Sequence, residues 1–64
     1  MTLPPEQWAE ATAALTMQAF KQRVYQTRDD ERLLAYIEYE KDRPHGTRPE
    51  RIGVANRRRQ KLRD

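Results

Sequence analysis

Cysteine and serine are both missing from this 64-residue sequence, and histidine occurs once, as His45. Without cysteine there are no disulfides and no thiolate metal ligands, and without cysteine or serine the commonest side-chain nucleophiles are absent. The lone histidine follows a proline in a turn-like segment and has no second nitrogen ligand with which to hold a metal. We therefore expect no enzymatic activity, no metal and no cofactor, and we interpret His45 as a solvated turn residue.

Long apolar runs are also missing. The longest uncharged stretch, residues 11–20, is far shorter than the ~20 residues that a membrane span needs. The N-terminal residues show no basic segment of the kind that begins a signal peptide. We expect a soluble, cytoplasmic protein that does not bind membranes. A chain of this length buries only about 60% of the surface of its unfolded state, so its core is small and a second copy can complete it.

What the sequence does have is an uneven distribution of charge. The whole chain has a formal net charge of +3. Residues 47–64 hold seven of the thirteen basic residues and two of the ten acidic ones, a net charge of +5, whereas residues 1–46 sum to −2. The C-terminal segment therefore predicts an acidic partner, either nucleic acid or an acidic protein surface.

The basic residues of this segment suit phosphate binding. Each can neutralise a phosphate and release its counterion, and arginine can also donate two parallel hydrogen bonds to one phosphate. The residues predicted to bind DNA or RNA are Arg48, Arg51, Arg57, Arg58, Arg59, Lys61 and Arg63. The alternative is that the basic run is only a solubilising tail.

Hydrophobic periodicity predicts an all-α domain of three helices, over residues 5–26, 30–42 and 48–62. For the third helix, Thr47 is the predicted N-cap, and Glu50 forms a capping box with it. The apolar stripe of this helix is thin. We expect its first half to dock on the core and its second half, residues 57–63, to fray unless a partner neutralises it.

The first predicted helix is apolar on two sides. A core stripe is formed by Ala9, Ala13, Met17, Phe20 and Val24. The nearly opposite side carries Trp8, Ala11, Leu15 and Ala19. Since the remaining chain is too short to cover both faces, we predict that the second face mediates self-association or binds a partner helix. The alternative is that Trp8 folds onto the basic helix and closes a monomeric bundle.

The second predicted helix begins at a cap formed by Asp29 alone or by Thr27 with Asp30. Its predicted buried side is Leu33, Leu34, Tyr36 and Ile37, with Tyr39 at the border. We expect residues 38–42 to form a solvated, charged end. Of the three tyrosines, any exposed near the basic helix can stack on nucleic-acid bases, although tyrosines at helical spacing are more often core residues.

The run Asn56-Arg57-Arg58, followed by Lys61-Leu62-Arg63, resembles the end of a homeodomain recognition helix over about a dozen residues. Val54-Ala55 stands where that family has an aromatic pair, so the resemblance implies a basic helix and no base-reading role for Asn56. The arginine run is also similar to the arginine-rich RNA-binding peptides of phage antiterminators.

These patterns favour a small accessory or regulatory protein that binds nucleic acid through its basic C-terminal helix and forms a homodimer through the first helix. A second hypothesis is an adaptor or inhibitor of the kind found in phages and mobile elements, anchored by the second face of the first helix. A third is a structural component of a larger assembly.

Overall fold

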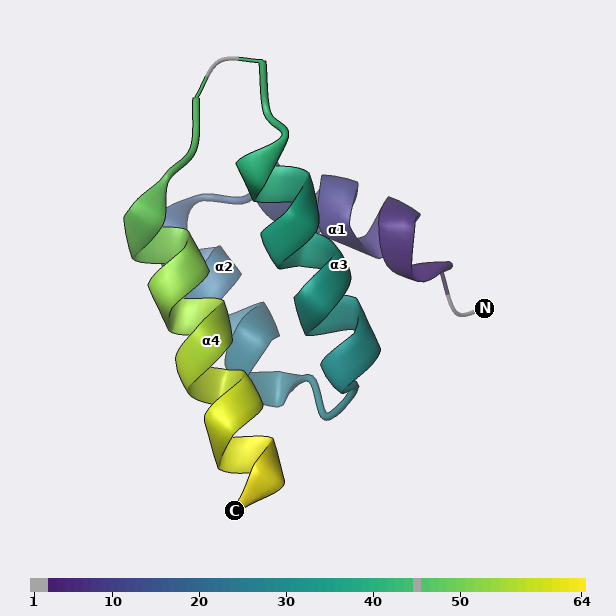
Figure 1. Ribbon diagram of the computed structural model, residues 1–64, viewed down its shortest axis with the longest axis vertical. Helices are drawn as coiled ribbons and strands as arrows, with labels where there is room; N and C mark the ends of the chain where they lie inside the picture. The colour runs from purple at the N-terminus through teal and green to yellow at the C-terminus, as the bar shows by residue number, and fades with distance from the viewer. Residues whose placement is uncertain (1–2, 45) are drawn as a thin grey trace.

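The computed structural model describes residues 3–44 and 46–64, and the prediction for His45 lies outside them. The described part of the chain contains helices and no strand, which confirms the all-α class. The helices are α1 (Pro5–Ala13), α2 (Met17–Gln26), α3 (Asp30–Lys41) and α4 (Pro49–Arg63). Figure 1 shows α3 and α4 running beside each other, with α2 behind them and α1 on the other side of α3.

The prediction of one helix over residues 5–26 was wrong, because the chain turns at residues 14–16 and makes two helices of it. The backbone of Ala14 ends α1, and Thr16 begins α2 in an extended conformation, where its hydroxyl accepts from the N–H of Ala19 at 3.4 Å. A side-chain cap of this kind stabilises a helix start. No proline or glycine lies in this turn, so the sequence offers only the weak signal of Thr16.

The core nevertheless contains the stripe predicted for the first helix. Ala9, Phe20 and Val24 are fully buried, and Ala13 and Met17 pack against the core. The rings of Phe20 and Tyr36 lie with their centroids 5.0 Å apart, which joins α2 to α3. Since the stripe lies on both sides of the turn, its two parts pack on different helices, with α1 mainly against α3 and α2 mainly against α4.

Helix α3 lies at the centre of the fold. Its N-cap is Asp29, whose carboxylate accepts from the N–H of Glu31 at 3.0 Å. This was one of the two predicted caps. Leu33, Tyr36 and Ile37 are buried as predicted, but Leu34 is exposed. Leu34 follows Leu33 directly, so its side chain points about 100° away from the core stripe.

Helix α4 begins one residue later than predicted. Arg48, and not Thr47, is the N-cap, and no side chain caps this helix. Pro49 occupies the first turn, where its missing N–H costs nothing. Gly46 provides the turn before it, with a φ of 100° that glycine adopts without strain. None of the four helices, all within the described residues, has the length and apolar character to traverse a bilayer.

Candidate nucleic-acid interface

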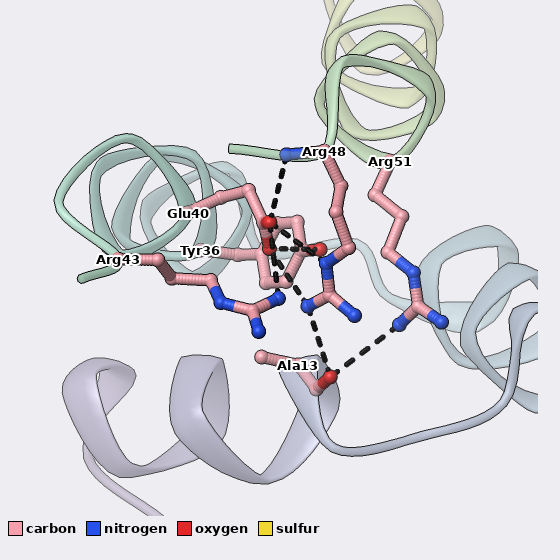
Figure 2. Close-up of polar contacts among 6 residues, drawn as sticks. All are labelled: Ala13, Tyr36, Glu40, Arg43, Arg48 and Arg51. Carbon is pink, nitrogen blue, oxygen red and sulfur yellow. Dashed lines mark hydrogen bonds and ion pairs between the residues drawn. The ribbon is translucent and has the colours of Figure 1, made fainter. Parts of the chain in front are cut away.

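The start of α4 is held by a buried carboxylate, Glu40, which lies at the end of α3 (Figure 2). The side chain of Arg48 donates to both oxygens, through Nε to Oε1 at 2.8 Å and Nη2 to Oε2 at 3.0 Å. The backbone N–H of Arg48 also donates to Oε1 at 3.0 Å. Tyr36 donates its hydroxyl at 2.9 Å and Arg43 its guanidinium at 3.3 Å. Glu40 is therefore fully hydrogen-bonded despite being inaccessible to solvent.

These contacts determine the ionisation of Glu40. Burial by itself raises the pKa of this carboxyl group, but the hydrogen bonds from Arg48 and Tyr36 and the charges of Arg48 and Arg43 outweigh it. The net result lowers the pKa of Glu40 from 4.5 to about 2. Burial, and then the hydrogen bond to Glu40, raises the pKa of Tyr36. At neutral pH Glu40 is therefore an anion and Tyr36 a hydrogen-bond donor, which suits a structural role.

Arg48, together with Arg51, also donates to the carbonyl end of α1 (Figure 2). The carbonyl oxygen of Ala13 accepts from Arg48 Nη2 at 3.0 Å and from Arg51 Nη1 at 3.4 Å. The last carbonyl groups of a helix have no intrahelical partner, and cations are favourable there. The Arg51 guanidinium also lies 5.0 Å from the centroid of the Phe20 ring, at cation–π distance. The basic residues that begin α4 thus bind the other three helices together.

Two further arginines of α4 form hydrogen bonds with other parts of the protein. Arg58 Nε donates to the carbonyl oxygen of Thr27, just after the end of α2, at 3.0 Å. Arg59 pairs with Asp30 through Nε to Oδ1 at 2.8 Å and Nη2 to Oδ2 at 3.3 Å. The hydrogen bond from Arg59 lowers the pKa of Asp30. Arg59 is therefore neutralised, whereas Arg58 is positioned by a neutral carbonyl and keeps its full charge.

The remaining cations of α4 face solvent. Arg57, Lys61 and Arg63 are exposed, and within residues 3–44 and 46–64 they form no ion pair or side-chain hydrogen bond. Two surface depressions meet at Arg57. One, of about 330 Å³, is lined by Asn56, Arg57, Arg59, Gln60 and Arg63. The other, of about 370 Å³, is lined by Tyr25, Arg57, Arg58 and Lys61.

The structure therefore divides the seven predicted phosphate-binding residues. Arg48 and Arg59 are paired with acids, and Arg51 is half-buried over Phe20. The second half of α4 was expected to fray, but it remains helical to Arg63, with Leu62 packed against the core. Its open cations therefore stand on an ordered helix.

The predicted second face of the first helix does not exist as one surface. Trp8 is only 7% exposed and belongs to the core, and Leu15 packs against the core from the turn. Ala11 and Ala19, both half-buried, lie on different helices. The monomeric alternative placed Trp8 against the basic helix. Instead, Trp8 belongs to α1, which packs mainly against α3. The turn at residues 14–16 is the physical reason, since it separates residues that a continuous helix would align.

Sequence reasoning missed Glu40, which was assigned to a solvated helix end. A signal was present: Glu40 follows Leu33, Tyr36 and Ile37 at the spacing that continues their buried stripe. A buried carboxylate on such a stripe requires a cation nearby. Arg48 is the first basic residue after the loop that follows α3.

In the part of the chain that the structure describes, no cluster of acidic or histidine side chains has the geometry to hold a metal ion. Comparisons with protein-family models, with curated proteins and with solved structures found no significant match.

Proposed function

We propose that this protein is a small, non-enzymatic nucleic-acid-binding protein that docks on phosphates through the second half of α4. The observation that carries the proposal is the exposed set Arg57, Lys61 and Arg63, which has no acidic partner among the described residues and stands on an ordered helix. Arg58 adds a fourth charge, because the acceptor that it binds among the described residues is a neutral carbonyl. Four cations on one helix match the closely spaced charges of a nucleic-acid backbone.

The proposal depends on α4 being an ordered helix that is fixed to the rest of the protein. Arg48 and Arg51 fix the start of α4 against α1, α2 and α3, and Leu62 packs its second half against the core. A cation on an ordered helix loses less conformational entropy on binding than one on a flexible tail. The ordered helix therefore favours docking over the alternative of a solubilising tail.

The expected mechanism is electrostatic docking with little base readout. With three or four phosphates neutralised, the slope of log affinity against log salt concentration should be about −3 on duplex DNA. Loss of one cation should weaken binding to all sequences alike.

The test is fluorescence anisotropy of labelled DNA and RNA titrated with the protein at low and moderate salt. The triple variant Arg57→Gln/Lys61→Gln/Arg63→Gln should bind at least about tenfold more weakly, because three counterion-releasing contacts are lost. The matched control Lys21→Gln/Arg23→Gln/Lys41→Gln removes the same net charge from exposed positions on α2 and α3. Equal weakening by both variants, or no binding of either nucleic acid by the wild-type protein, would refute the proposal.

A second candidate, an adaptor or structural component that binds another protein, has one observation in its favour. Exposed Leu34 lines a groove of about 500 Å³ at the junction of α1 and α3, together with Pro4, Pro5 and Ala35 and with three acidic side chains, Glu6, Glu31 and Glu38. Its apolar residues replace the Trp8 face as the anchor in this hypothesis. If the protein is an adaptor, Leu34→Asp should abolish partner capture while the triple variant of α4 has a small effect. Dimerisation stays a prediction for light scattering to test.

A further inference from the structure

We propose that the depression around Tyr25 is a binding site for single-stranded nucleic acid, in which a base stacks on the tyrosine ring and Arg57, Arg58 and Lys61 hold the adjoining phosphates. The inference rests on the proposed function and names the substrate class of the same surface. It adds a residue from α2 to an interface otherwise formed by α4.

Tyr25 is placed for this role by the packing of α2 on α4. Its side chain is 52% exposed, whereas the neighbouring Val24 is fully buried and anchors the last turn of α2 in the core. The depression that Tyr25 lines is otherwise formed by three basic side chains of α4. An exposed aromatic ring bordered by cations on a rigid helix provides the two elements of single-strand recognition, a stacking platform and an electrostatic groove.

Arg58 holds its charge at a defined position in this depression. Its Nε donates to the carbonyl oxygen of Thr27 at 3.0 Å, two residues after Tyr25 in sequence. The carbonyl orients the guanidinium without neutralising it, and the other arginine N–H groups stay available to a phosphate. Arg57 and Lys61 are one helical turn apart on α4, so both can follow the backbone past the ring.

Single strands are favoured over duplexes because a base must leave its stack to lie against a side-chain ring. In a duplex the bases are paired and stacked, and their faces are inaccessible without an unstacking cost of a few kcal/mol. A single strand exposes them, and every base has a face that can stack, so little sequence preference follows.

Tyr39 provides a comparison within the same molecule. It is also partly exposed, at 39%, but it lines a depression with Glu6, Glu10, Glu38 and Asp42. Four acidic side chains repel phosphates, so Tyr39 lacks the second element of the proposed site. Exposure of a tyrosine alone is therefore not what distinguishes Tyr25.

The experiment uses anisotropy titrations of a fluorescein-labelled deoxythymidine oligonucleotide and a labelled duplex against four proteins: wild type, Tyr25→Leu, Tyr25→Phe and Tyr39→Leu. Loss of the ring in Tyr25→Leu should weaken single-strand binding by about 5- to 20-fold, the lower part of the range measured for base stacking. Tyr25→Phe keeps the ring and should bind like wild type. Tyr39→Leu controls for loss of an exposed tyrosine and should also bind like wild type. Duplex binding should be the same for all four proteins.

Photocrosslinking gives a second measurement. An oligonucleotide that carries 5-bromouracil should crosslink to Tyr25, and mass spectrometry of the digested adduct should locate the base on the peptide that contains it. If wild type binds both nucleic acids while Tyr25→Leu leaves single-strand binding unchanged, the stacking site is refuted and the proposed function stands. If wild type binds neither, both proposals fail.

Discussion

The basic side chains at the start of α4 all bind the protein itself, whereas in its second half only Arg58 and Arg59 do so among the described residues. At the start of the helix, Arg48 and Arg51 bind a buried carboxylate, a helix-end carbonyl and an aromatic ring. Further along, Arg57, Lys61 and Arg63 are exposed. The difference shows that basic composition does not by itself indicate a binding surface, because some of the charge stabilises the protein that carries it.

Breaking the Glu40 cluster should have the largest effect on stability. Glu40→Ala leaves Arg48 without its carboxylate. Removal of one partner from a buried ion pair costs about 3 to 5 kcal/mol, and we expect the lower part of this range because the Arg48 side chain is 33% exposed. Urea denaturation followed by circular dichroism should report this loss, or no folded protein. Arg57→Ala, at an exposed position on the same helix, should change the free energy of unfolding by less than about 0.5 kcal/mol. Similar values for the two variants would contradict the division of α4.

Acid should break the same contact in the wild-type protein. Because the folded state lowers the pKa of Glu40 from 4.5 to about 2, its stabilisation is present above pH 4.5 and is lost as the pH falls toward 2. The total change for this shift is roughly 3 kcal/mol. Denaturation midpoints measured at a series of pH values should decline over this window. Glu40→Gln should remove most of the decline, and an unchanged pH profile in that variant would contradict the assignment.

A smaller change in the free energy of unfolding, of opposite sign, is expected at Gly53 in the first half of α4. Gly53 lies inside the helix, and a Cβ added there would contact nothing within 4 Å. Gly53→Ala should therefore raise the free energy of unfolding by about 0.8 kcal/mol through helix propensity alone. Nucleic-acid affinity should not change, because Gly53 lines neither depression at Arg57. A destabilised Gly53→Ala protein would indicate that the helix needs flexibility at this point.

The smallest expected effect comes from converting a neutralised arginine into an open one. Asp30→Asn removes the acid that pairs with Arg59, which lines the same depression as Arg57 and Arg63. Anisotropy at low salt should show duplex DNA bound about two- to threefold more tightly, since one more phosphate contact becomes possible. The pair is partly exposed and screened by solvent, so the free energy of unfolding should change little. Asp29→Asn at the neighbouring position serves as the control, and equal gains in both variants would point to net charge alone.

Much of the fold could be predicted from periodicity and caps. The stripe from Ala9 to Val24, the cap at Asp29 and the buried side chains of Leu33 and Ile37 are local patterns, and the structure confirms them. The turn at residues 14–16 could not be predicted, because no proline or glycine ends α1 there and Thr16 alone is a weak signal. The bonds that Arg48 and Arg51 donate to the Ala13 carbonyl cross 35 and 38 residues of sequence.

The candidate site was predictable only as a collection of basic residues. Sequence reasoning placed seven cations in one segment but could not sort them, and it did not connect Tyr25 with α4. Whether an arginine is neutralised depends on an acid within about 3 Å, and that distance is set by the packing of helices far apart in the chain.

The sequence by itself determined the helical class, the apolar stripes and the concentration of positive charge in the last eighteen residues, because these are properties of composition and local spacing. Only the tertiary structure decided that Glu40 is buried, that Arg48 and Arg59 are paired internally, and that Arg57 and Lys61 lie beside Tyr25 on an open surface. The physical reason is that charge is counted along the chain, whereas its neutralisation depends on which side chains folding brings into contact.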